Sequence, residues 1–434
     1  MVYEVSIPSF QDERDPRAAT LQWVAGNSAL SAGVAPVAAV KKQQFVEKLR
    51  TMPERSLPTS VGWMDLQMRV SSSGTADEFI GDEEPDGLGS TNKVIVGTSV
   101  TRERWMVCSS LAGGKARALA LSDTGVSRGL VPWVGVAARV PHPDESTEQF
   151  VESFRDDGRA FCFLPLPVKT GLPVHVNAYF ELSSNRRDIW FGGDMAGGGA
   201  ARSEWNQALL TDAVAPAYAK TLEAAAQTLG PSAAFYRLFP TAQSHNAPWS
   251  LILPPLYSNL SRVPCLRATD PLQGAEISSR WVAPATAMFP DGGEPAAPAL
   301  ADALRAEGIW LIEGAPKDVC ESFARHCEDS DAVRTLSPAA VRAMLRRTDV
   351  PHPALDSRKR ALALLEYVLS DVNPADPMGA ADLEGVPLVP LTNGTLGTFA
   401  FRGGRTDGAE VMDETRQGEI GGPKRPPSHA MRPR

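Results

Sequence analysis

The sequence lacks both long apolar runs and a targeting signal. No apolar stretch approaches the roughly 20 residues that a membrane-spanning helix needs, so we predict no membrane partner. The N-terminus, MVYEVSIPSFQDERDPR, does not have the positive segment followed by an apolar segment that a signal or transit peptide has. The expected location of the protein is therefore the cytoplasm.

Positive charge and cysteine are both scarce. The 43 Lys and Arg residues are outnumbered by 51 Asp and Glu residues, the formal net charge is −8, and no basic stripe follows any expected element. These features exclude a general nucleic-acid binder. An odd and scattered set of cysteines is typical of reduced thiols in a cytosol rather than of a disulfide framework. The five are Cys108, Cys162, Cys265, Cys320 and Cys327.

Apolar residues make up 43% of the 434 residues and charged residues 22%, which is the balance of a globular protein with two or three cores. The start of the chain, 1–95, is poorly patterned. It contains a short helix expected over 37–52 and an acidic, glycine-rich insertion over 71–92 that we expect to be flexible. The end, 401–434, closes with GGPKRPPSHAMRPR and is predicted to be a disordered basic tail.

Strand patterns fill 93–200, which we predict to be a β-rich domain. The runs RWMVCSSL and ARALALS, the latter at 116–122, flank the glycine turn AGGK, so an antiparallel hairpin is expected there. GLVPWVGVAARV and RAFCFLPLP predict further strands. The clearest strand is VHVNAYFEL, 174–182, in which every second residue is apolar, so one face is buried and the other is wetter.

A four-residue spacing of apolar side chains replaces the strand pattern after residue 202. It predicts a helix over 203–229 with Ser203 as the N-cap. Pro216 lies inside this helix and predicts a kink or a break, because its ring opposes the carbonyl four residues earlier. The spacing is carried by Leu210, Val214, Tyr218 and Leu222.

Two later helices and a closing hairpin complete a mainly helical region over 201–400. LSPAAVRAML has Ser337 as its expected N-cap, and SRKRALALLEYVLSD follows it. Asn393 and Gly394 stand between two apolar runs and predict a hairpin turn. The fold class expected from the sequence is therefore α+β, with a β-rich first half, a helical second half, a closing hairpin and a loose tail.

Metal and nucleophile sites have little support. Cys320, His326 and Cys327 lie close in sequence, but no second ligand pair follows at a zinc spacing, so we expect no metal site. No G-x-S-x-G elbow occurs, and we expect no catalytic residue. His175 stands on the wetter face of its strand, where a histidine is more often a hydrogen-bonded structural residue than a base.

Anion binding is the chemistry that the sequence favours most. The stretch LSSNRRDIWFGGDM, 182–195, places Arg186 and Arg187 between a strand and a glycine-rich link to a helix. Helix N-termini attract anions, and arginine grips a phosphate or carboxylate with two donors. Neighbouring residues at a strand end point to opposite faces, so at most one of the two arginines reaches a given ligand. The alternative, solvated charges or ion-pair partners, stays open. DGLGS at 86–90 lacks the Lys-Ser/Thr of a phosphate-binding loop.

Several long motifs resemble the internal repeat of the sacsin family, in matching order and over roughly 95–400. They are GRAFCFLPLPVKTGLPVHVNAYFELSSNRRDIW, RSEWN, VAPAYA, WVAPATAMFPD, ALALLEYVLSD and GVPLVPLTNGTLGTF. Among their residues we expect a structural role for Asn185, Trp190, Arg202, Trp205, Asn206, Asn393 and Gly394.

The resemblance implies a chaperone-type module that follows an ATP-binding domain of the GHKL class. The Glu/Asn helix, Asp-x-Gly turn and glycine-rich lid of that domain are not found in this sequence. We therefore expect no cofactor in this chain, ATP only where it is joined to a GHKL domain, and no ATP hydrolysis by the isolated chain. The implied partners are client proteins or other chaperones.

Two rival functions stay open beside a chaperone or co-chaperone module. One is part of a GHKL-class ATPase, completed by a nucleotide-binding domain in cis or in trans. By analogy with that class, Arg186 or Arg187 would reach the terminal phosphate. The other is a structural repeat that spaces binding modules along a larger protein.

Overall fold

The chain divides into two compact units, each discontinuous in sequence. Unit 1 comprises Met1–Ala268, Ser279–Gly293 and Ile312–Arg334, and unit 2 comprises Thr269–Ser278, Glu294–Leu311 and Thr335–Arg434. The computed structural model describes residues 2–6, 44–74, 94–155, 158–192, 198–241, 247–271, 279–293, 295–327, 333–347, 352–373, 381–391 and 396–400. The predicted tail, most of the acidic insertion and the 37–43 part of the first expected helix lie outside these residues.

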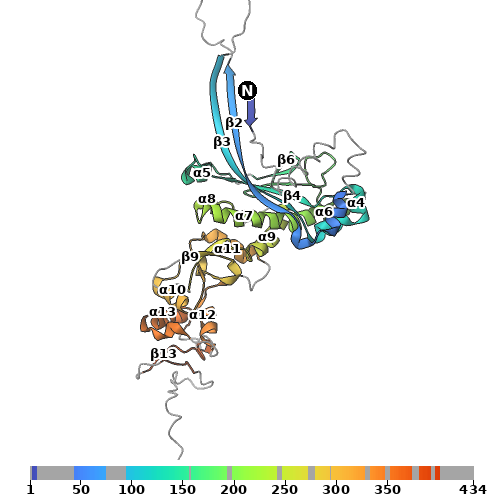
Figure 1. The fold of residues 1–434 in the computed structure, drawn as a ribbon. Coiled ribbons are helices and arrows are strands. Elements are labelled where there is room, and N and C mark those ends of the chain that lie inside the picture. Colours follow the sequence, from blue (N-terminus) through green and yellow to red (C-terminus); the bar gives the residue numbers. More distant parts are fainter. Residues whose placement is uncertain are drawn as a thin grey trace, which may run out of the picture. The chain divides into compact units, whose positions relative to one another are not determined.

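A seven-stranded sheet forms the centre of unit 1 (Figure 1). Its order is β1-β2-β3-β4-β7-β5-β6, and every neighbouring pair is antiparallel except β5 and β7. The strands are β1 (Val2–Ser6), β2 (Thr59–Gly74), β3 (Val94–Leu111), β4 (Trp133–Val140), β5 (Arg159–Cys162), β6 (Leu164–Lys169) and β7 (His175–Ala178).

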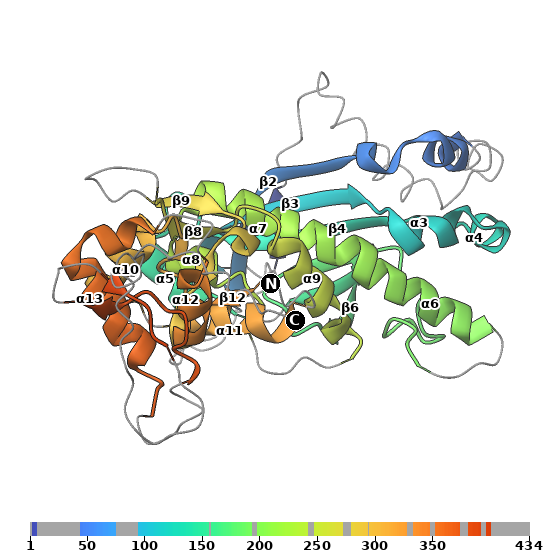
Figure 2. The ribbon, with the colours of Figure 1, turned by 90° about the horizontal axis from the view of Figure 1, so that it is seen from below.

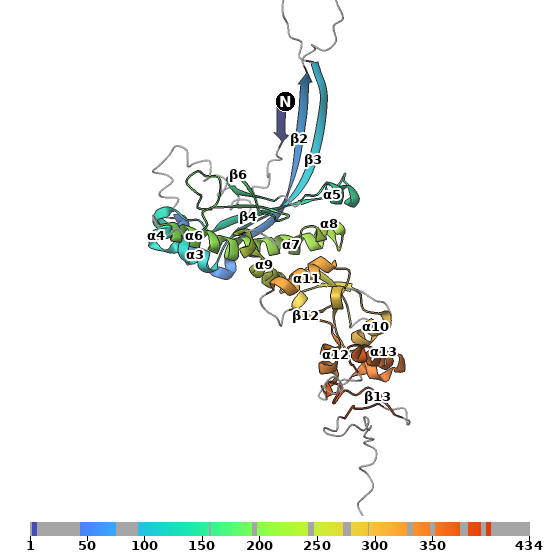
Figure 3. The ribbon, with the colours of Figure 1, turned by 180° about the vertical axis from the view of Figure 1, so that it is seen from behind.

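One face of this sheet is covered by a continuous helical segment. It consists of α6 (Gly199–Leu209), a single π-helical turn η3 (Leu210–Val214) and α7 (Ala215–Leu229), which run in one line beside the sheet in Figure 3. Helix α7 packs on β2, β3 and β4. The prediction of a kink or a break at Pro216 is met only by this π turn, which ends two residues before Pro216, and the helical segment continues through it.

The residues between sheet and helix are apolar and almost wholly buried, as period two in the strands and period four in the helix require. The exposed fraction is 1% or less for Met106, Cys108, Val134, Val136, Ala138, Val140, Ala160, Val174, Val176, Ala178, Leu210, Val214, Tyr218 and Leu222. The predicted strands at 129–140 and 174–182 are confirmed, although the ladder of the latter is short. The run at 159–167 forms two antiparallel strands, β5 and β6, that turn at Phe163, instead of the one strand expected.

Unit 1 also contains smaller elements beside this sheet and its covering helical segment. They are a helix over 44–51, η1 (Glu54–Ser56), α3 (Gly114–Leu121), α4 (Asp123–Arg128), α5 (Thr147–Ser153), α8 (Ala233–Tyr236), η4 (Trp249–Ile252), α9 (Leu253–Leu260), η5 (Pro284–Thr286), η6 (Asp291–Gly293) and α11 (Lys317–His326). A second sheet has the order β12-β10-β11-β8-β9. Its strands are β8 (Leu266–Thr269), β9 (Ser279–Val282), β10 (Met288–Phe289), β11 (Leu311–Ile312) and β12 (Arg334–Thr335).

The hairpin predicted around AGGK is wrong, because ARALALS forms helix α3 instead of a strand. Alanine, leucine and arginine are good helix formers. The first turn of α3 is also capped from a distance. The Asp212 carboxylate, on the π turn, accepts hydrogen bonds from the backbone N–H groups of Lys115 and Ala116 at 2.6 and 3.3 Å. No local pattern shows that contact.

Two further expectations need correction. Ser203 is not the N-cap of α6, since the helix begins four residues earlier, after Gly198 in the left-handed region (φ 81°). Ser203 is buried inside the helix. The predicted flexible insertion also begins too early, because 71–74 continue strand β2 and pair with β3.

Unit 2 is mainly helical (Figure 2). Its elements are α10 (Pro298–Ala306), α12 (Pro338–Leu345), η8 (Pro353–Asp356), α13 (Arg358–Leu369), β13 (Val389–Pro390) and β14 (Leu396–Gly397). Ser337 caps α12 by accepting a hydrogen bond from Ala340 N, as predicted. The closing hairpin is confirmed by the antiparallel pair β13 and β14. Asn393 and Gly394 themselves lie outside the described residues. The fold is thus α+β, as the sequence predicts.

A buried arginine ties α12 to the end of α13 in unit 2. Arg342 is 3% exposed and donates to Asp371 Oδ1 at 2.6 Å, to Asp371 Oδ2 at 3.0 Å and to Val368 O at 2.7 Å. These bonds satisfy a guanidinium that would be costly to bury alone. The hydrogen bonds and charge of Arg342 lower the pKa of Asp371 below its ordinary value.

We predict that Asp371→Asn destabilises unit 2 by about 1–2 kcal/mol near neutral pH. This is less than a fully buried pair would lose, because the Asp371 side chain is 43% exposed. Since the folded-state pKa is lowered, the stabilisation is present above the unfolded pKa and is lost as the pH falls through the folded value. The wild type should therefore lose stability on acidification to a degree that the variant does not. The stability of unit 2 at each pH is measured by hydrogen exchange of α12 and α13 peptides in urea.

Asp302→Asn is the matched control, since Asp302 bonds Arg360, whose side chain is 35% exposed, at 2.8 Å. Asp302→Asn should lower the free energy of unfolding of unit 2 by less than Asp371→Asn does. Equal losses in the two variants would contradict the special role of the buried arginine.

Candidate functional site

The predicted arginine pair lies in a tight loop that follows β7. Leu182 and Ile189 form a bridge, and the backbone of Ser183 donates to Asp188 O at 2.9 Å. Asn185 Oδ1 accepts from the backbone N–H of Arg187 at 3.1 Å, and Arg186 has a positive φ of 53°. Asn185, Arg186 and Arg187 are all exposed. Neither arginine forms an ion pair with any residue in the described part of the chain.

The base of this loop is held by Asn206 of α6, which is fully buried. Its side chain accepts from Glu181 N at 2.9 Å, and it donates to Glu181 O at 2.7 Å and to Trp190 O at 2.8 Å. One amide thus satisfies three backbone groups, because it carries both an acceptor and two donors. The loop is anchored to the helix by this side chain.

Trp205 and Arg202 extend the same anchor. Trp205, also fully buried, donates its indole N–H to Tyr179 O at 2.9 Å. The Arg202 guanidinium lies over the Trp190 ring at 5.5 Å and within 3.9 Å of Glu181. Arg128 pairs with the same carboxylate at 2.8 Å. The RSEWN and NRRDIW motifs are therefore two halves of one structural contact, and Arg202 is engaged within it.

The face of the sheet opposite α7 carries aromatic rings. The registers place Trp105 of β3, Trp133 of β4, His175 and Asn177 of β7 and Phe161 of β5 on this face, and the rings of Tyr179 and Phe163 adjoin it. We call these rings, without Asn177, the aromatic face. Its rings are partly exposed, and Phe163 is 40% exposed.

The rings of the aromatic face form two groups. In the first, His175 stacks on Trp105 at 4.8 Å and contacts Phe161 at 5.5 Å between centroids. In the second, Tyr179 makes edge-on contacts with Trp133 at 6.1 Å and Phe163 at 4.6 Å. Such offset and edge-on geometries are the favourable ones for aromatic pairs, so the rings hold each other in place.

Polar bonds fix the rims of the rings. Trp105 and Trp133 donate their indole N–H groups to Glu103 and Ser109, at 3.1 and 2.8 Å. His175 Nδ1 accepts from Arg159 N at 3.1 Å. The indole donors of both tryptophans are thus satisfied within the protein, while parts of the ring surfaces stay open to solvent. His175 has a role in packing and hydrogen bonding rather than a free base position.

A small-residue strand lies beneath the rings. The Trp133 ring covers Gly135, where a Cβ atom would stand 3.3 Å from the ring. At the edge of the sheet, Asn177 Oδ1 accepts from Phe163 N at 3.1 Å and holds Phe163 at a positive φ of 64°. Leu164 follows, 75% exposed, the most exposed large apolar side chain of the described residues. Sequence reasoning missed this surface, because its members come from four strands.

Two cations border the aromatic face. Arg159 of β5 and Lys169 of β6 are register partners, and both are exposed. Neither has an ion-pair partner among the described residues. Like charges side by side repel, and an anion between them would relieve the repulsion.

The cysteine and histidine cluster considered from the sequence does not assemble as a metal site in the described residues. Cys320 is buried on α11, while His326 ends that helix and stacks on Tyr257. All five cysteines are free thiols. Burial raises the pKa of Cys108 to about 12 and of Cys320 to about 11, so both thiols are neutral and unreactive at physiological pH.

Comparison with curated proteins finds a sequence relative. The chain is 31% identical to human sacsin (Homo sapiens) over 317 residues. The match covers 68% of this chain and 6% of sacsin, so the chain spans only a small part of that relative. No protein-family description matches the chain, and no solved structure matches it. No helix in the described part of the chain has both the length and the apolar character needed to cross a membrane.

We predict that Asn206→Ala loosens the arginine loop and destabilises unit 1 by about 2–4 kcal/mol, because Glu181 N and Trp190 O lose their bonds to Asn206 and Glu181 O keeps only its bond from Trp190 N. Hydrogen exchange over 181–192 should rise, and the urea midpoint should fall.

Asn185→Ala is the matched control. Asn185 is an exposed asparagine of the same loop with bonds to Ser183 Oγ and Arg187 N, and its loss should cost under about 1 kcal/mol. Equal exchange rates in wild type and Asn206→Ala would show that the loop does not depend on this anchor.

Proposed function

Because this chain contains a sacsin-related region, we propose that it is a sacsin-like protein-binding module of chaperone or co-chaperone type, acting in the cytoplasm. Its binding surface is the aromatic face of the sheet, together with Leu164. The occupant is an extended apolar segment of a client protein that carries acidic residues.

The partly exposed rings support this proposal. Aromatic side chains contribute large contact areas at a small entropy cost, and a packed cluster of them is preorganised. Burial of apolar surface favours association, and preorganised rings reduce the ordering cost that opposes it. Phe163 and Leu164 stand furthest into solvent, so they would contact a partner first.

Charge supports the choice of occupant. Arg159 and Lys169 lie beside the rings without an ion pair to any residue that the structure describes, so an acidic residue flanking an apolar segment would be attracted there. The chain as a whole carries a net charge of −8, which disfavours a nucleic acid as the general partner.

We predict that Phe163→Asn combined with Leu164→Ser weakens client binding about tenfold, since loss of anchor side chains typically costs a kilocalorie or more each. Asparagine tolerates the positive φ at position 163, so the fold should be retained. Binding is measured with reduced, carboxymethylated α-lactalbumin, an acidic and permanently unfolded protein, and folding by circular dichroism.

Leu362→Asn is the control for general surface apolarity, because Leu362 is 42% exposed in unit 2. It should bind as the wild type does. Wild-type protein that neither binds this client nor suppresses aggregation would favour the spacer role. Tight binding of single-stranded RNA in place of the client would also overturn the proposal.

A second function is supported by the arginine loop: the chain completes an ATPase whose nucleotide lies in another domain. The supporting observation is a pair of exposed guanidinium groups that form no ion pair with any described residue, on a loop anchored by Asn206. Because the base of the loop is anchored, the two guanidinium groups are limited to a small region. A catalytic contact to a phosphate requires such positioning. ATP is then a cofactor of the joined protein.

We predict that Arg186→Ala with Arg187→Ala lowers ATP turnover in the natural protein that contains this region joined to a nucleotide-binding domain, by about tenfold or more. Folding should be unaffected, because both side chains are exposed. Arg262→Ala, an exposed arginine of the same unit, is the control. Unchanged turnover in the double variant would sink this second function.

A further inference from the structure

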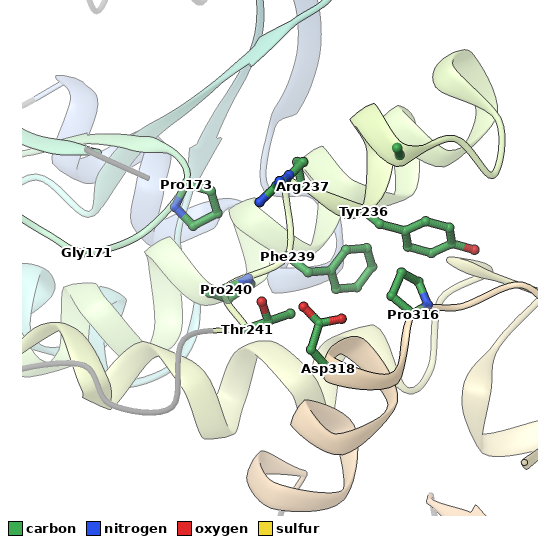
Figure 4. Close-up of a pocket in the computed structure, with 10 residues that line it drawn as sticks. Gly171, Pro173, Tyr236, Arg237, Phe239, Pro240, Thr241, Pro316 and Asp318 are labelled. Atoms are coloured by element: carbon green, nitrogen blue, oxygen red, sulfur yellow. The ribbon is translucent and has the colours of Figure 1, made fainter. Parts of the chain in front are cut away.

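A pocket in unit 1, separate from the aromatic face, has the composition of a ligand site. Its volume of about 330 Å³ lies at the small end of the roughly 300–1,000 Å³ typical of small-molecule sites. Three segments build it: the loop before β7, the chain from α8 onward and the start of α11 (Figure 4). The lining residues used below are Pro173, Tyr236, Arg237, Phe239, Pro316 and Asp318.

The apolar walls of this pocket consist of prolines and packed aromatic rings. Pro173 and Pro316 have a fixed φ, and Phe239 is 3% exposed and contacts the rings of Phe235 and Phe323. Tyr236 contributes its ring, while its hydroxyl points away from the charged side chains in Figure 4. Burial raises the pKa of Tyr236 to about 12, so this wall is neutral. A ligand would therefore meet an apolar, uncharged wall on this side of the pocket.

Two unlike charges face each other across this pocket. Figure 4 shows the side chains of Arg237 and Asp318 on opposite sides of the pocket, with Phe239 between them. The Arg237 guanidinium has no hydrogen bond or ion pair with any described residue. Asp318 Oδ1 accepts only the backbone N–H of Val319, at 3.0 Å, among the described residues. Both charges are exposed and available to a ligand.

A cation and an anion separated by apolar rings, and not paired with each other, are complementary to a molecule that carries both charges. We propose that this pocket binds a zwitterion: a carboxylate placed at Arg237, an ammonium group placed at Asp318 and an apolar portion over Phe239. Arginine offers a planar fork of donors to the carboxylate, and the Asp318 carboxylate accepts from the ammonium. The ligand is a free amino acid or short peptide, or a peptide segment with one acidic and one basic side chain.

The test uses the full chain and isothermal titration calorimetry. The probes are leucine, Ala-Leu and Ala-Ala-Leu, the N-acetyl and C-amide forms of Ala-Leu, and a capped pentapeptide containing Lys and Glu. We expect at least one free zwitterion to bind, and each cap on Ala-Leu to weaken binding about tenfold. Equal binding of the capped pentapeptide assigns the source to a polypeptide segment; its failure assigns it to free zwitterions.

Variants locate the two contacts. Arg237→Gln should abolish the advantage of a free carboxylate, and Asp318→Asn that of a free ammonium group. Glu321→Gln, on the exposed face of α11, is the control and should bind as the wild type does. No binding of any probe at about 10 mM, or wild-type binding by both pocket variants, overturns the proposal. The Phe163→Asn, Leu164→Ser protein should bind the zwitterionic probes as the wild type does, because neither residue lines this pocket. This result separates the pocket from the aromatic face.

Discussion

The packing of α6, η3 and α7 onto one face of the seven-stranded sheet is the constraint on which unit 1 depends. In an extended strand, neighbouring side chains point to opposite faces, so covering one face determines what the other presents. The covered face takes Val134, Val136, Val176 and Ala178, none of them exposed. The residues between these in each strand point to the opposite face, where the aromatic rings lie.

The helical segment also sets the position of elements that lie far from it in sequence. Asp212 on its π turn caps α3, and Asn206 on α6 anchors the arginine loop. A π turn adds one residue and rotates the side chains on either side of it relative to each other. The irregularity before Pro216 therefore lies directly beside the carboxylate that caps a neighbouring helix. The π turn thus contributes both to the packing of the segment on the sheet and to the capping of α3.

Local patterns predicted the parts of the fold that are determined locally. Period two in VHVNAYFEL gave the buried face of β7, and Ser337 before Pro338 gave the start of α12. ARALALS was predicted as a strand from the glycine turn before it, although its residues are good helix formers, and the Asp212 cap comes from nearly a hundred residues away. The arginine loop was visible as a motif. The aromatic face was not, since only the register of β3, β4, β7 and β5 brings its rings together.

The aromatic face and the arginine loop share one support, although they offer different chemistry. Trp205 binds the backbone at Tyr179, which carries a ring of the aromatic face. Its neighbour Asn206 binds the backbone at Glu181, where the arginine loop begins. Two adjacent side chains of α6 therefore hold both surfaces through a segment of three residues, 179–181. A force that displaced Tyr179 would act on the base of the loop as well, because no flexible linker separates them. This common attachment explains why Trp205 and Asn206 of RSEWN are both fully buried and both hydrogen-bonded to the backbone of this segment.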